Sequence, residues 1–135
     1  MTTVTLAGKE YPMSFSLMAA KKIAADHGSV QKFLDGIDAE NVTESAIEKI
    51  IYIVDLLINQ GCAYKNYFEK NVPTPKNAPV IEGKWTPMPS EVLGIAINFE
   101  NIGEIYDKIS ECMGTDTKRK VETVGEKGKE KASQE

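Results

Sequence analysis

The stretch VTLAGKEYPMSFSLMAAKKIAADHGS (4–29) decides the fold, because it combines two strand patterns, a tight turn and a helix. Residues 3–6 and 9–15 alternate in polarity, which predicts two β-strands. Gly8 follows Ala7 between them, and glycine readily takes the positive φ of a tight hairpin turn. Pro12 has no N–H to donate, which predicts an open edge at that point. Because an isolated hairpin is marginal in water, it must pack on another element.

Two short helices are predicted after the hairpin. Ser16 can cap a helix over 17–27, and Gly28 can end it with a positive φ. The apolar residues of this helix recur at helical spacing: Leu17, Ala20, Ile23 and Ala24. Ser29 can cap a second helix that carries Val30, Phe33 and Leu34 inward. We expect a loop over 35–42.

The longest predicted helix covers about 43–69, with Asn41 and Thr43 as rival caps. Its apolar positions step by three and four: Ile47, Ile50, Val54, Leu57, Gly61, Tyr64 and Phe68. Further isoleucines, at 51, 53 and 58, make this stripe wider than a two-helix seam requires. Two interpretations follow. The stripe is the central core of a small bundle, or part of it is a surface for a partner or for self-association.

Residues 71–89 hold five of the six prolines and the single tryptophan, Trp85, which predicts a long loop. Trp85 either anchors this loop to the core or contacts a partner, since tryptophan is common at binding hot spots. Helices are then predicted at about 89–97 and 100–113, with a break near Asn98 and an end at Gly114. The carboxylates Glu104, Asp107 and Glu111 share one side of the last helix, which is either a solvated face or a surface for a basic partner helix.

The predicted fold class is therefore α+β, mainly α: an N-terminal hairpin packed on four or five helices. The globular domain is predicted at 1–114. Residues 115–135 carry two valines and many charges of both signs, which predicts a disordered tail.

The composition narrows the function classes. The chain of 135 residues has a net charge of −4 and a sequence pI of about 5.1, which argues against a nucleic-acid-binding or anionic-membrane-binding protein. The first ten residues lack a signal-peptide pattern, and no apolar run is long enough to span a bilayer. We therefore expect a cytoplasmic protein. Cys62 and Cys112 are expected to be reduced and buried, with a disulfide between them as the alternative.

Catalytic and metal-binding motifs are not found in the sequence. His27 is the single histidine, and at a helix end it is expected to interact with the helix dipole. The sequence contains no zinc-ligand spacing, no Gly-rich phosphate loop and no nucleophile elbow. We therefore expect no catalytic residue, no metal, no cofactor and no enzyme activity.

One family combines these elements in this order. The strand-turn-strand TLAGKEYPMSF, followed by a helix that ends in HGS, is the most specific part of the pattern, which extends over about 4–113. In this order of elements, the chain resembles the small tail assembly chaperones of long-tailed bacteriophages and prophages of Gram-positive hosts. The resemblance implies a non-enzymatic protein of the infected cell that binds the tape measure protein and keeps it soluble. It also implies that the protein helps to recruit tail tube subunits and is absent from the finished virion.

The candidate partner-binding residues come from apolar periodicity and from the proline-rich loop: Leu57, Tyr64, Phe68, Trp85, Phe99, Ile102 and Tyr106. Two rival functions stay open. One is a structural or adaptor protein that stays in a phage tail, a class usually richer in strand. The other is a small regulator of antitoxin or helix-turn-helix type. Against the regulator, the second helix offers only Lys32 as a basic residue for gripping DNA.

Overall fold

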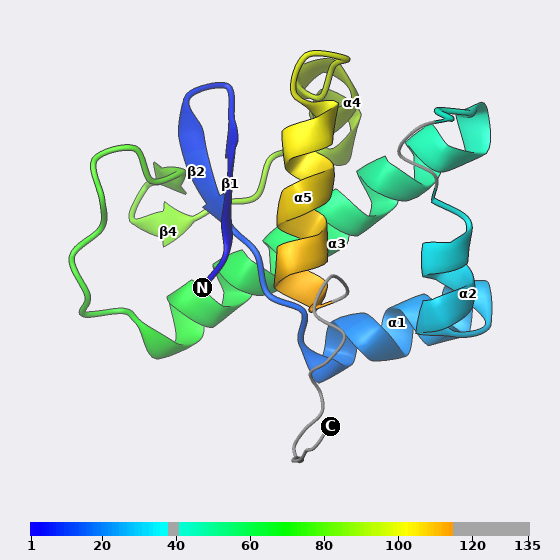
Figure 1. Ribbon diagram of the computed structural model, residues 1–135. Helices are drawn as coiled ribbons and strands as arrows, with labels where there is room; N and C mark the ends of the chain where they lie inside the picture. Colours follow the sequence, from blue (N-terminus) through cyan, green and yellow to red (C-terminus); the bar gives the residue numbers. More distant parts are fainter. Residues whose placement is uncertain (38–40, 115–135) are drawn as a thin grey trace, which may run out of the picture.

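The fold is known from a computed structural model, which describes residues 1–37 and 41–114 (Figure 1). Its elements are β1 (Thr3–Leu6), β2 (Lys9–Pro12), α1 (Leu17–His27), α2 (Val30–Asp35), α3 (Glu44–Phe68), β3 (Val80–Ile81), β4 (Lys84–Trp85), α4 (Ser90–Ala96) and α5 (Ile102–Met113). The predicted class, mainly helical with an N-terminal hairpin, is confirmed. The predicted disordered tail, 115–135, and residues 38–40 of the predicted loop lie outside the described residues.

The N-terminal hairpin turns at Ala7 and Gly8, which both have positive φ, of 52° and 81°. Val4 pairs with Tyr11, so both side chains lie on the buried face. The second strand is shorter than predicted and ends at Pro12 instead of residue 15. Its backbone turns toward α3 there, because the N–H of Ser14 donates to the carbonyl oxygen of Leu57, 3.0 Å away.

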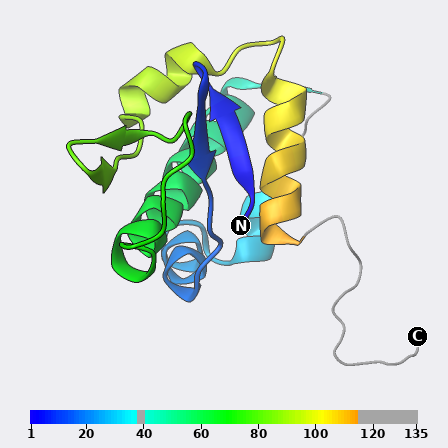
Figure 2. The same cartoon turned by 90° about the vertical axis from the view of Figure 1, so that its left-hand side faces the viewer.

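Helix α3 is the longest element and crosses the molecule (Figure 1). The hairpin lies between α3 and α5, so the two strands fill the space that separates these helices (Figure 2). Thr43 caps α3 by accepting from the N–H of Ala46, which decides between the two candidate caps. The most deeply buried side chains come from the N-terminal hairpin segment and from all five helices, and they form one core: Leu6, Met13, Ile23, Phe33, Ile53, Leu57, Leu93 and Ile105.

Contact between the hairpin and α3 requires a residue without a side chain at Gly61. A Cβ atom built on Gly61 would lie 2.2 Å from the carbonyl oxygen of Pro12, which is closer than non-bonded Cβ atoms come to other atoms in proteins. The backbone of β2 therefore rests directly on the helix. This close approach leaves no room for a side chain, which explains why position 61, in the apolar stripe of α3, is a glycine.

The predicted apolar stripe of α1 is wrong in part. Ala19 and Ile23 are buried, whereas Leu17 and Ala24 are exposed. Ser16 explains the rotation, because its hydroxyl accepts from the N–H of Ala19 and also donates to the side chain of Gln60 on α3. This contact holds the first turn of α1 with Ala19 inward.

The proline-rich segment contains a second hairpin that the sequence analysis does not predict. Strands β3 and β4 pair antiparallel, with Val80 opposite Trp85. Their turn is formed by Glu82 and Gly83, both with positive φ. Each strand has only two residues, too few to produce a recognisable alternation. The predicted break near Asn98 is confirmed, because α4 ends at Ala96 and the side chain of Asn98 accepts from the N–H of Asn101.

Candidate partner-binding surface

The seven predicted contact residues differ widely in exposure. Leu57 is fully buried, with 0% of its surface exposed, so its prediction as a contact residue is wrong. Leu57 is covered where the segment after β2 meets α3, since its carbonyl oxygen accepts from the N–H of Ser14, 3.0 Å away. Phe68 and Phe99 are 73% and 80% exposed. The remaining four are exposed or half-buried: Tyr64, Trp85, Ile102 and Tyr106.

The surface residues fall into separate groups. Tyr64, Phe68 and Trp85 lie at the C-terminal end of α3, whereas Phe99 and Ile102 lie beside its N-terminal half. Tyr106 belongs to neither group, because it lines a hollow between α2 and α5. The structure therefore divides the predicted surface into two regions and leaves Tyr106 apart from both.

The first region, which we call the aromatic end, consists of Tyr64, Tyr67 and Phe68. The ring centroids of Tyr64 and Phe68 are 5.0 Å apart, and those of Tyr67 and Phe68 are 6.2 Å apart. No residue of α3 after Cys62 is buried, because the last turns of the helix extend past the N-terminal hairpin. Tyr67 is absent from the sequence-based candidates since it lies off the stripe. Its position next to Phe68 at a helix end is the signal that could have found it.

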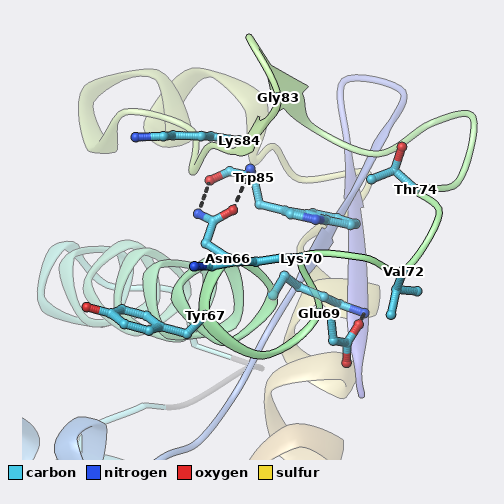
Figure 3. A pocket seen from close by; sticks show the side chains of 10 residues that line it. Asn66, Tyr67, Glu69, Lys70, Val72, Thr74, Gly83, Lys84 and Trp85 are labelled. Atoms are coloured by element: carbon cyan, nitrogen blue, oxygen red, sulfur yellow. Dashed lines mark hydrogen bonds and ion pairs between the residues drawn. The ribbon is translucent and has the colours of Figure 1, made fainter.

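Trp85 is held beside the last turns of α3 by its own backbone. The side-chain amide of Asn66 accepts from the N–H of Trp85 and donates to its carbonyl oxygen, each over 2.9 Å (Figure 3). The indole ring is half-buried and packs against the core. Trp85 therefore does anchor the loop, as one of the two interpretations predicts, while part of its ring stays accessible. Asn66, which makes this possible, is not predicted by the sequence pattern.

A cavity of about 510 Å³ lies between the end of α3 and the β3–β4 hairpin. In Figure 3 the Trp85 ring lies above the end of α3, and Tyr67 points away from that ring. Lys65 lies with its ammonium nitrogen 5.4 Å from the centre of the Trp85 ring and forms a 2.8 Å ion pair with Glu69. Lys70 and Lys84 also line the cavity, so this end of an acidic protein is locally basic.

The second region is an apolar groove between the first half of α3 and the corner where α4 meets α5. Its volume is about 210 Å³. Hydrophobic side chains dominate its lining: Val42, Ile47, Ile50, Ile51, Ile97, Phe99 and Ile102, with Gly94 and Asn98. We call it the α3–α4 groove. Ile47 and Ile51 belong to the predicted apolar stripe of α3, which supports the interpretation that part of this stripe faces outward.

His27, Asp26 and Tyr52 contact one another where the end of α1 meets α3. His27 lies edge-on against Phe33 and Tyr52, with ring centroids 4.8 and 4.9 Å away. Burial and a 2.8 Å hydrogen bond to Asp26 raise the pKa of Tyr52 to about 12. The same hydrogen bond, with one from Lys22, lowers the pKa of the Asp26 carboxyl.

Cys62 and Cys112 are free thiols, Cys62 buried and Cys112 half-buried. Burial raises the pKa of each thiol to about 11. Within residues 1–37 and 41–114, His, Cys, Asp and Glu form no group of three that could hold a metal ion. In the same part of the chain, no helix has the length and apolar character that a membrane crossing needs.

Comparison with known protein families, with curated proteins and with solved structures finds no match to this chain.

Proposed function

We propose that the protein is a non-enzymatic binding protein that keeps an apolar helical client soluble during assembly. The single observation that supports this function is the aromatic end, where Tyr64, Tyr67 and Phe68 lie together and exposed. Tyrosine and tryptophan supply large contact areas at interfaces, and contiguous exposed apolar groups often mark interaction sites.

The resemblance to tail assembly chaperones supplies the client in this proposal. The client is the tape measure protein of a long-tailed phage, which exposes long apolar helices before the tail tube polymerises around it. In this proposal the complex also recruits tail tube subunits, acts in the cytoplasm of the bacterial host, and is lost before the virion is complete. The acidic net charge of −4 favours solubility of such a complex.

Co-expression of the tagged chain with the large helical tape measure candidate encoded beside it tests the proposal. We expect the large protein to be insoluble alone and to co-purify with several copies of this chain in size-exclusion chromatography with light scattering. If the two proteins never associate and this chain elutes alone as a monomer, the chaperone function is wrong. The adaptor and regulator alternatives would then come first.

Variants at matched exposed positions sharpen this test. Phe68→Ser removes an aromatic ring from the aromatic end, whereas Leu17→Ser removes an exposed apolar side chain from α1. We expect Phe68→Ser to reduce the amount of soluble client and Leu17→Ser to leave it unchanged. Equal effects of both variants would show that the client is not bound at the aromatic end.

A further inference from the structure

The α3–α4 groove is a second surface, remote from the aromatic end. Ile47 in the groove and Phe68 at the aromatic end are separated by about 30 Å along α3, at 1.5 Å per residue. In Figure 1, α4 and the start of α5 lie at the top of the molecule, whereas the C-terminal end of α3 lies at the lower left. A ligand of one surface therefore need not touch the other.

Small and exposed residues keep this groove open. Gly94 faces Ile51 across it, and a Cβ atom built on Gly94 would lie 3.5 Å from the Cδ1 of Ile51. A larger residue at this position would therefore reach into the groove. Phe99 stands at the edge with most of its ring exposed, and Ile47 is also exposed. The groove thus has an apolar floor with accessible apolar edges.

Four glutamates, which we call the acidic rim, lie within one helical turn of residues that line the groove. Glu44 and Glu48 lie three residues before Ile47 and Ile51, and Glu91 lies three residues before Gly94, so each is one helical turn from a lining residue. Glu100 follows Phe99 directly. All four glutamates are exposed, and none takes part in the ion pairs found among the described residues.

The nearest basic residue of α3 does not neutralise this rim. Lys49 donates to the hydroxyl of Ser45, and its aliphatic chain lies against Gly36 beyond the end of α2. A ligand in the groove therefore meets an apolar floor between negative charges. This complementarity selects a partner that presents apolar side chains flanked by positive ones.

We propose that the α3–α4 groove binds an amphipathic helix of a partner protein, with an apolar ridge flanked by Lys or Arg. A helix suits the groove better than an extended strand, because α3, α4 and α5 satisfy their backbone groups internally and offer no sheet edge for strand addition. Side chains at i, i+3 and i+4 of the partner insert among Ile47, Ile51 and Phe99. This inference is independent of the client proposed for the aromatic end.

Two synthetic peptides test the inference on the full chain. Both are amphipathic helices of about 16 residues, a length at which an isolated helix becomes stable enough to bind. They share one leucine face and differ only in their flanking residues, Lys in one and Glu in the other. We expect the Lys peptide to shift the methyl resonances of Ile47, Ile51 and Ile102 and to leave those of Ile53 and Ile109 unchanged. The Glu peptide should bind at least about tenfold more weakly.

Charge reversal on the protein supplies the matched control. The double variant Glu48→Lys/Glu91→Lys should weaken binding of the Lys peptide about tenfold, and added salt should weaken the wild-type complex. Glu104→Lys/Asp107→Lys changes the net charge equally on exposed positions outside the groove and should leave binding within about twofold. Phe99→Ser should also weaken binding of the Lys peptide without unfolding the protein, since its ring is 80% exposed.

Several results would overturn the inference. Equal binding of both peptides would show that the acidic rim does not distinguish positive from negative flanking residues. Equal losses in the two double variants would indicate attraction by net charge alone. Shifts confined to residues outside the groove, or unchanged binding by a folded Phe99→Ser protein, would place the peptide elsewhere. Because Trp85 lies at the other end of α3, its fluorescence should stay constant throughout, and a change would indicate binding at the aromatic end.

Discussion

The side chain of Asn66 takes the place of a strand partner for Trp85. It accepts from the N–H and donates to the carbonyl of the same residue, both over 2.9 Å, and so satisfies both backbone groups. The β3–β4 hairpin is too short to be stable by itself, with two residues in each strand. These two hydrogen bonds therefore join the hairpin to the last turns of α3 and hold Trp85 there.

Replacing Asn66 with alanine should release the hairpin. Asn66→Ala removes both hydrogen bonds and leaves half-buried backbone groups without them, which costs about 1–2 kcal/mol of the free energy of unfolding. Trp85 is the single tryptophan, so its fluorescence reports the change directly. We expect emission shifted to longer wavelength in the native state and a lower denaturation midpoint.

Asn59→Ala is the matched control, because Asn59 is exposed and, among residues 1–37 and 41–114, its side chain bonds only to Asp55 one turn before it. It should change stability by less than about 0.5 kcal/mol. Unchanged Trp85 emission in Asn66→Ala would show that the hairpin is held by other contacts.

Gly61 should tolerate no side chain. Gly61→Ala places a methyl group against the carbonyl of Pro12, and because both groups are backbone-fixed the hairpin must move, at a cost of about 3 kcal/mol or more. Gly103→Ala is the control, since nothing lies within 4 Å of its added Cβ. It should be neutral or stabilising by up to about 1 kcal/mol through helix propensity. Urea denaturation compares them, and equal midpoints would contradict the close contact.

Leu57 and Phe68 should respond oppositely to truncation, although both belong to the same predicted stripe. Leu57→Ala leaves a cavity in the core and should cost about 2–5 kcal/mol. Phe68→Ala removes an exposed ring and should change stability by less than about 0.5 kcal/mol. Thermal unfolding followed by circular dichroism measures both. A large loss in Phe68→Ala would show that the aromatic end serves the core instead of a partner.

The thiol of Cys62 should make stability fall in alkaline solution. Its pKa is about 11 in the folded protein against 9.0 for the free group, because burial disfavours the thiolate. The unfolded chain therefore releases its proton first, so the contribution is fully present below pH 9 and is lost as the pH rises toward 11. Denaturation midpoints of wild type and Cys62→Ala across this interval measure the difference in slope. Parallel curves would contradict the raised pKa.

Much of the fold could be predicted from the sequence because its signals are local. The positive φ of Gly8 sets the first turn, and Ser16 and Ser29 both cap helices by accepting backbone N–H groups. Glu104, Asp107 and Glu111 are exposed together on α5, as their spacing predicts. Each of these features depends on residues within one turn of the chain, so a single sequence contains the necessary information.

The candidate surface could be predicted only in part. Periodicity places Leu57 and Phe68 on one stripe of α3, but it does not say where the neighbouring elements end. The N-terminal hairpin covers α3 at Leu57 and Gly61 and does not reach Phe68, so one residue is core and the other is surface. The hydrogen bonds between Asn66 and Trp85 connect residues nineteen apart in the chain, and no local sequence pattern predicts them.

The sequence by itself therefore determined the helices, the caps of α1 and α2 and the first hairpin turn, since these follow from steric and hydrogen-bonding preferences within a few residues. The tertiary structure alone decided which apolar residues stay exposed and how they group. Burial is a property of packing between distant segments, here of β2 on α3 at Gly61 and of α4 beside Ile51 at Gly94. For this protein, the aromatic end and the α3–α4 groove become visible only once those contacts are made.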